Sequence, residues 1–184
     1  MKPTENLKYE HQAVKLMLKI MSKISESIKS KEVFYTKDVE EIVDFLVVYF
    51  DKGHRIKEEK FFYPAFKFDD IQMKNDCIVL LNEHLLGKSY LNEIICCVEN
   101  CKIGSTFSCE KIADCMINYV TLIQNHIQKE ENIYFPYADN VLSEDNQIEL
   151  SKQFQTIDNK IIGTEVQKGF DELLKEMEYK YLKE

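Results

Sequence analysis

A duplicated motif is the feature that most constrains what this chain can fold into. Residues 54–59 and 126–131 both read His-x-x-Lys-Glu-Glu, and in each copy an aromatic residue followed by proline stands four positions after the second glutamate. A Glu-His pair also recurs, at residues 10–11 and 83–84, and a lysine follows each of these histidines by four positions. All four histidines of the chain therefore occupy repeated positions. Such self-similarity indicates an internal duplication with two equivalent halves.

Both halves have the apolar periodicity of helices. Apolar residues recur every three or four positions, which is typical of a helix with one inward face. The chain has only five glycines and three prolines, a composition that favours long helices over turn-rich β structure. We therefore predict an all-α, up-down-up-down four-helix bundle. Its helices are expected at about residues 6–30, 37–62, 69–100 and 109–135.

The last forty residues lie outside the duplication. Helical patterns recur there, interrupted by Gly163, and we interpret them as an extra helical segment packed on the bundle. A homodimer interface or a surface for a partner protein is the alternative use of this tail. A length of 184 residues fits one domain. We thus expect a single domain over 1–184, with the bundle at about 6–138 and the C-terminal helical extension at about 143–184.

Six polar side chains interrupt the inward helix faces. In each half a histidine and a glutamate stand four residues apart and so point the same way, and another histidine stands alone on a neighbouring helix. A lone inward histidine is more often a core residue than a ligand, but the matched pattern in both halves favours a metal site. Metal removes the cost of burying unpartnered charge, and two carboxylates with four imidazoles suit two bridged metal ions with open positions. The candidate ligands are His11, His54, Glu58, His84, His126 and Glu130.

The neighbours of these residues are assigned other roles. Glu59 and Glu131 lie one step around the helix, so we expect them to support ligands or face solvent rather than bind metal. Lys57 and Lys129 are expected to be exposed. Imidazole and carboxylate donors suit iron, and they also suit manganese or zinc.

The overall composition limits the cellular compartments and the classes of partner that we expect. A net charge of −8 argues against nucleic acid as a partner. The longest apolar run, residues 42–50, is far too short to cross a membrane, and no apolar signal region opens the chain, so we expect a cytoplasmic protein. Six cysteines without a Cys-x-x-Cys pair are then expected to be reduced and mostly buried. A metal or redox role for Cys97 and Cys101, which share a helix face, is the alternative.

The order of the six candidate ligands resembles the hemerythrin-like, or HHE cation-binding, family. That family's pattern is a lone His, then His-x-x-x-Glu, then a lone His, then His-x-x-x-Glu or Asp, and the likeness covers about residues 7–138. It implies a four-helix bundle with a non-haem di-iron centre that contains two iron ions. The resemblance assigns one iron ion to His11 and His54, the other to His84 and His126, and bridging positions to Glu58 and Glu130.

One position departs from the oxygen-carrying members of the family. They have a fifth histidine four residues after the histidine of the third helix, and Lys88 stands there instead. The remaining four-His, two-Glu set is similar to that of iron-sulfur-cluster repair proteins of the same superfamily, which carry an additional Cys-bearing N-terminal segment. We expect the stem of Lys88 to line the pocket while its ammonium reaches a carboxylate or the surface. Gly87 is expected to leave room for a ligand.

These inferences favour a non-haem di-iron protein that binds a small diatomic ligand or peroxide. The ligand would be oxygen, nitric oxide or peroxide, and the role sensing or detoxification. Whether the chain is an enzyme stays open, because turnover needs an electron donor or redox partner protein and no flavin, haem or nicotinamide motif is present. The alternative is an iron-sensing, storage or delivery module without redox turnover, whose metal state a partner reads through the C-terminal tail. A metal-free bundle is the remaining interpretation.

Overall fold

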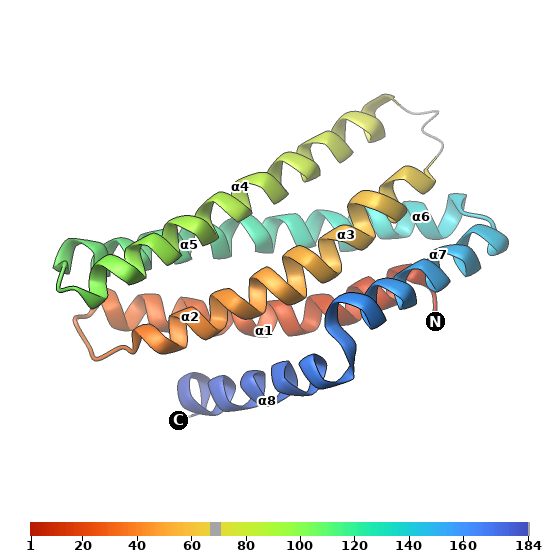
Figure 1. Cartoon of the computed structure of the whole chain (residues 1–184). Helices are drawn as coiled ribbons and strands as arrows, with labels where there is room; N and C mark the ends of the chain where they lie inside the picture. Colours follow the sequence, from red (N-terminus) through yellow and green to blue (C-terminus); the bar gives the residue numbers. More distant parts are fainter. Residues whose placement is uncertain (67–70, 184) are drawn as a thin grey trace.

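Antiparallel helical rods make up most of the molecule (Figure 1). The computed structural model describes residues 1–66 and 71–183, and the described part is helical apart from short connections. The first rod is α1 (Pro3–Lys29). The second joins α2 (Thr36–Phe45), the π-helical η1 (Leu46–His54), α3 (Arg55–Lys57), the π turn η2 (Glu58–Phe62) and the 3₁₀ turn η3 (Tyr63–Ala65). The third is α4 (Ile71–Lys102), and the fourth joins α5 (Thr106–Lys129), the π turn η4 (Glu130–Tyr134) and α6 (Phe135–Val141).

Each rod packs against two others. α1 contacts α2 and α5, while α4 contacts the same two helices from the other side. This closed arrangement of successive antiparallel rods is the up-down-up-down bundle, so the predicted all-α fold is confirmed. The predicted start of the third helix, residue 69, lies outside the described residues. The fourth rod runs on to Val141, beyond the predicted end at residue 135.

Two apolar clusters occupy the interior, one towards each end of the bundle. On α1, Leu7 belongs to one cluster and Val14 to the other; on α4, Leu80 and Leu91 divide in the same way. The histidines of these helices fall between the two clusters, in one polar layer sealed by apolar packing on both sides. Within residues 1–66 and 71–183, no helix has the length and apolar content that crossing a lipid bilayer requires.

The duplication is visible in the backbone. The π turns η2 and η4 begin at the equivalent residues Glu58 and Glu130. Each is followed by a proline, Pro64 or Pro136, which has no backbone N–H to continue the α-helical ladder. A π turn widens the helix locally and is frequent at functional sites. The repeated glutamates therefore sit where the helix is distorted in the same way in both halves.

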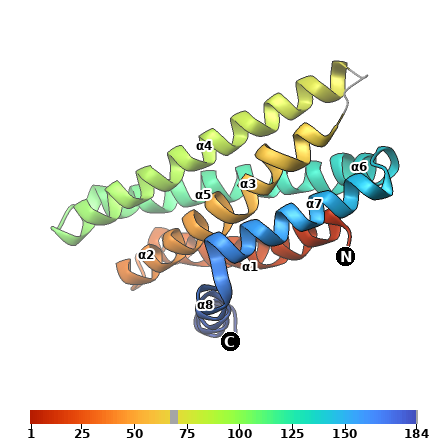
Figure 2. The same ribbon diagram turned by 45° about the vertical axis from the view of Figure 1, so that its right-hand side comes forward.

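The C-terminal extension folds back along the bundle on the α1 side, away from α4 (Figure 2). It consists of α7 (Glu144–Ile157), the π turn η5 (Asp158–Ile162) and α8 (Gly163–Leu182). Gly163 has a φ of 62°, a left-handed conformation that glycine adopts readily where the chain turns between α7 and α8. Leu174 and Met177 of α8 are buried, and the ring of Phe170 meets that of Phe45 edge-on. The tail thus packs on the bundle as an extra helical segment.

The cysteines differ from the sequence-based expectation. Cys101 and Cys109 form a disulfide with a Cα–Cα distance of 5.2 Å, so the prediction of reduced thiols is wrong for this pair. The short turn at Gly104 sets the last turn of α4 beside the first turn of α5, which brings together two cysteines that no familiar spacing motif connects. Of the four free cysteines, Cys96 is exposed and the other three are buried.

Candidate metal centre

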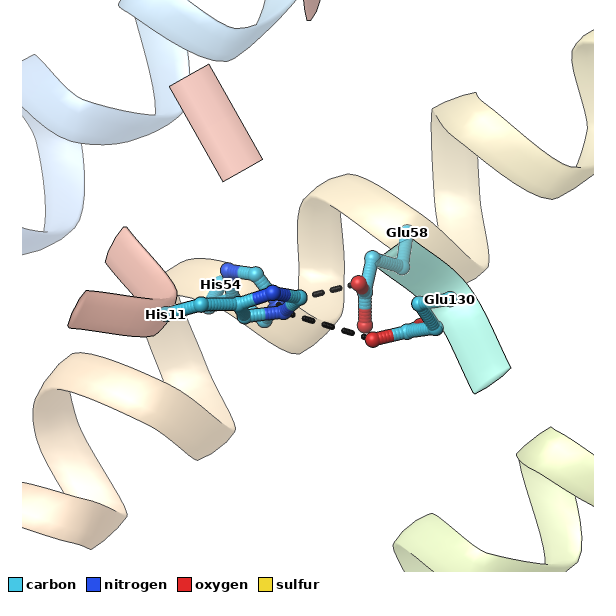
Figure 3. A group of neighbouring side chains, drawn as sticks. All are labelled: His11, His54, Glu58 and Glu130. Carbon is cyan, nitrogen blue, oxygen red and sulfur yellow. Dashed lines mark hydrogen bonds and ion pairs between the residues drawn. The ribbon is translucent and has the colours of Figure 1, made fainter. Parts of the chain in front are cut away.

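The six predicted ligands converge in one buried layer of the bundle. Two of the four rods contribute a histidine and a glutamate four residues apart, and the other two contribute one histidine each. None of the six side chains is more than 2% exposed. Figure 3 shows four of them, with the imidazoles of His11 and His54 facing the carboxylates of Glu58 and Glu130. They come from α1 (His11), η1 (His54), η2 (Glu58), α4 (His84), α5 (His126) and η4 (Glu130).

The layer divides into two half-sites that share both glutamates. In each half-site, four ligand atoms lie within 4.8 Å of one another. His11 and His54 make one half-site with the two glutamates, and His84 and His126 make the other. The structure thus brings together every residue of the predicted set and groups the histidines in the pairs that the family resemblance implies.

The two carboxylates span the half-sites. Glu58 Oε1 lies 2.9 Å from His54 Nε2, and Glu58 Oε2 lies 3.4 Å from His84 Nε2. Glu130 is placed in the same way, with Oε1 3.3 Å from His126 Nε2 and Oε2 3.3 Å from His11 Nε2. Each glutamate therefore offers one oxygen to each half-site, which is the disposition of a bridging ligand.

The spacing of the donor atoms suits bound metal ions better than it suits direct hydrogen bonds between the side chains. In each half-site the two histidine Nε2 atoms are 3.0 Å apart. Ligand nitrogens on adjacent corners of an octahedron, with metal–nitrogen bonds of about 2.1 Å, are about 3 Å apart. Both oxygens of Glu58 and Oε2 of Glu130 are buried without a hydrogen-bond partner in the described chain. Orphaned carboxylate oxygens are costly in a protein interior, and shared cations remove that cost.

A second layer of carboxylates fixes the orientation of every imidazole. Each histidine uses Nδ1 towards a glutamate at 2.8–3.0 Å, which leaves Nε2 pointing into the centre. Carboxylate–histidine pairs of this kind set the tautomer of metal ligands and raise their basicity. The pairs are His11 with Glu131, His54 with Glu10, His84 with Glu59, and His126 with Glu83.

The electrostatics of the centre favour a cation at Nε2. Burial alone would lower the pKa of His54, but the charge of Glu58, the hydrogen bond with Glu10 and the charge of Glu10 outweigh it and raise this pKa to about 10. His126 is raised to about 10 in the same way, by Glu130 and its other acidic neighbours against burial. When no metal is bound, His54 and His126 thus hold protons beside the carboxylates. A metal ion would replace those protons.

Each second-layer glutamate has a cationic neighbour, and one of these cations contradicts the sequence-based expectation. Lys57 is fully buried rather than exposed, and it pairs with Glu10. Lys129 pairs with Glu83 and keeps 37% of its side chain exposed. The prediction that Glu59 and Glu131 support ligands agrees with their contacts to His84 and His11. The other two outer glutamates were missed, although the repeated Glu-His pair carried the signal.

Tyr63 breaks the equivalence of the two halves. Its hydroxyl donates a hydrogen bond to Glu130 Oε1. The repeat-related residue is Phe135, which stacks on the ring of His11 at 5.5 Å between centroids and has no hydroxyl to offer. Glu58 accordingly has no equivalent donor among the described residues. The two bridging candidates are therefore chemically different.

The expectations that the stem of Lys88 lines the pocket and that Gly87 leaves room for a ligand are wrong, whereas Lys88 reaches the surface as expected. Lys88 is exposed and does not line the centre, because the inward position on this turn of α4 belongs to Gly87. A Cβ atom at Gly87 would lie 3.4 Å from Ile123 Cδ1 and 3.6 Å from Tyr119 Cε2. These are ordinary van der Waals distances, so side chains of α5 fill the space beside Gly87 and no open ligand pocket lies there. Lys15, the repeat counterpart of Lys88, instead reaches Glu131 Oε2 at 2.6 Å.

Comparison with known proteins agrees with this geometry. No curated protein and no solved structure is significantly similar to the chain. The family model of the hemerythrin HHE cation-binding domain matches residues 2–138, which contain all six candidate ligands and the four rods except for the last residues of α6. The chain therefore belongs to the hemerythrin HHE cation-binding domain family, as its repeated histidines and glutamates predict.

Proposed function

We propose that this chain is a non-haem di-iron protein that binds a small ligand, namely oxygen, nitric oxide or peroxide, for sensing or detoxification. The observation that carries the proposal is the pair of half-sites sharing two glutamates, of which Glu58 has both carboxylate oxygens and Glu130 has Oε2 buried without a hydrogen-bond partner in the described chain. Four imidazoles and two carboxylates are the donors that iron accepts in such proteins. The proposed ligands are His11, His54, Glu58, His84, His126 and Glu130.

The protein residues around the proposed centre have separate tasks. The histidines hold the metal through Nε2, and the outer glutamates keep those nitrogens aimed inward. Six protein ligands shared by two ions leave positions open, and there the ferrous ions would supply electrons and binding sites to a small ligand. Tyr63 places one hydroxyl donor at Glu130. The apolar clusters on both sides keep bulk water out of the layer.

Anaerobic loading with ferrous iron tests the proposal. We expect about two iron ions per chain, because two shared carboxylates can join two half-sites, and a change in the optical spectrum on addition of air, nitric oxide or peroxide. A saturating ratio near one in the unaltered chain would overturn the dinuclear assignment. Two bound irons whose spectrum responds to none of the three ligands would overturn the ligand-binding role.

The alternative, an iron-sensing, storage or delivery module without redox turnover, is also supported by a specific observation. A buried chain of contacts runs from ligand candidate His54 to Asp158 in the C-terminal extension. Such a connection would let a part of the surface respond to metal occupancy. Spectroscopic silence towards the small ligands, together with two tightly bound irons, is the outcome that favours this second function.

A further inference from the structure

The C-terminal extension contacts the second layer of the metal centre through one buried lysine. Lys57 is fully buried, and its ammonium lies 2.5 Å from Asp158 Oδ1 and 3.2 Å from Asn6 Oδ1. It also pairs with Glu10 and lies 5.7 Å from the ring centroid of Phe154. Asp158 and Phe154 both belong to the extension. The extension therefore contributes one negative charge and one aromatic ring to the surroundings of this buried lysine.

This lysine stands two contacts away from a candidate metal ligand. Glu10 uses Oε1 for Lys57 and Oε2 for His54 Nδ1, the latter at 2.8 Å. The line of contacts thus reads Asp158, Lys57, Glu10, His54. Every side chain in it except Asp158 is less than 10% exposed, so the charges interact with little screening by water.

The duplicated half gives an internal comparison. There, Lys129 pairs with Glu83, and Glu83 contacts His126 Nδ1 at 3.0 Å. Within the described chain, Lys129 makes no ion pair with the extension, and it remains partly exposed. The same lysine–glutamate–histidine line therefore occurs twice, but the extension covers only one of them.

We propose that docking of the C-terminal extension and metal binding at the His11–His54 half-site are coupled through Lys57, and that Asp158 is the positioning residue of this coupling. The proposal rests on the proposed metal-binding function. Without Asp158, the buried ammonium would be balanced by Glu10 alone. The ammonium of Lys57 would then interact more strongly with the Glu10 carboxylate. The hydrogen bond between Glu10 and His54, which orients and polarises the imidazole, would become weaker.

The coupling between docking of the extension and metal binding must be reciprocal. If docking favours metal at this half-site, metal at this half-site favours docking by the same factor. The effect should be local, because α8 is anchored independently, with Lys180 2.5 Å from Asp38 Oδ2 and with Phe170 packed on Phe45. The segment that responds to metal is therefore expected to be residues 150–162, around η5, rather than α8.

Half-site variants of the full chain separate this proposal from a general loss of stability. His84→Ala leaves the His11–His54 half-site, and His11→Ala leaves the other. Cobalt(II) affinity is measured by absorbance and calorimetry with and without Asp158→Asn. We expect Asp158→Asn to weaken binding about tenfold in the His84→Ala background, at the low end of outer-layer effects, and less than twofold in the His11→Ala background. Asp158→Glu should restore most of the affinity.

Amide hydrogen exchange gives a second measurement, which does not require mutation of any metal-ligand residue. Cobalt(II) should slow amide exchange over residues 150–162 in the unaltered chain, and Asp158→Asn should remove that protection. Asp171→Asn, the same change at an exposed carboxylate of α8, is the matched control and should change neither affinity nor exchange. Equal weakening of both half-sites, or exchange insensitive to cobalt(II), overturns the coupling while metal binding stands. Failure of the unaltered chain to bind cobalt(II) overturns the proposed function and the coupling together.

Discussion

A single residue makes the surroundings of the two candidate bridging glutamates, Glu58 and Glu130, different. Tyr63 and Phe135 occupy equivalent positions of the duplication, but only Tyr63 has a hydroxyl, and it donates to Glu130. Burial, followed by the nearby charges of Glu130 and Glu58, holds the pKa of Tyr63 well above its usual range, so this hydroxyl keeps its proton and remains a donor. The duplicated backbone thus carries a centre whose two carboxylates have different surroundings.

The Tyr63→Phe variant tests that difference. A hydrogen bond to a charged group contributes about 1.5–3 kcal/mol, so metal-free Tyr63→Phe should lose unfolding free energy of that order in urea denaturation. Metal stoichiometry should be unchanged, because the tyrosine occupies no ligand position. Tyr137→Phe, which alters a partly buried tyrosine packed on Phe66, is the control and should have little effect. Equal stability of Tyr63→Phe and the unaltered chain would show that the contact contributes nothing.

The imidazoles give the metal-free protein a defined pH dependence. The pKa values of His54 and His126 rise to about 10 in the folded state, against about 6.5 when unfolded. A raised folded-state pKa stabilises the fold fully below the unfolded value and loses that effect as the pH passes the folded value. The melting temperature of chelator-treated protein should therefore fall steadily between pH 6.5 and pH 10. His54→Gln should flatten part of this slope, and a melting temperature independent of pH across this window would contradict the assignment.

At the scale of the helices, periodicity predicted the rods because an inward face repeats every three or four residues whatever the details of the turn. It could not predict π turns, which depend on how one distorted turn is accommodated. A proline such as Pro64 or Pro136 lacks a backbone N–H and so ends or distorts a helix, but the residue type alone does not decide between these outcomes. In the structure the rod ends one residue beyond Pro64, whereas it continues as α6 through Pro136. An aromatic residue precedes both prolines, so this repeated pair alone does not determine whether the helix ends or continues.

The connection between α4 and α5 carries a testable covalent link. The disulfide between Cys101 and Cys109 closes a loop with a sequence separation of 8. Loop-closure entropy for that length corresponds to about 2.5 kcal/mol, so reduction should lower the melting temperature by roughly 5–10 °C. Cys109→Ser should melt at the reduced protein's temperature with or without reductant. Cys96→Ser, which removes an exposed free thiol, should respond to reductant as the unaltered chain does.

At the scale of the whole molecule, the sequence predicted the bundle and the candidate ligands but only part of what surrounds those ligands. The six ligand positions could be inferred because polar residues on an apolar face are conspicuous and occur twice. The outer layer could be inferred only in part, through Glu59 and Glu131. Lys57 has the charge and spacing of a solvated residue, but contacts with α1 and with Asp158 of the extension bury it. The disulfide was missed for the same reason, since both features are made by tertiary contact.

Metal removal should show that the centre stabilises the fold as a whole. A metal at about 100 times its dissociation constant adds about 2.7 kcal/mol per site, which corresponds to roughly 5–11 °C in melting temperature. Glu58→Ala should abolish most of the metal-dependent rise, because its oxygens lie between both half-sites. Glu59→Ala should reduce the rise far less, because Glu59 contacts the outer nitrogen of His84 and the guanidinium of Arg55 and its side chain is 33% exposed. Equal losses in these two neighbouring variants would mean that the wrong carboxylate of the repeated Glu-Glu pair has been assigned to the metal.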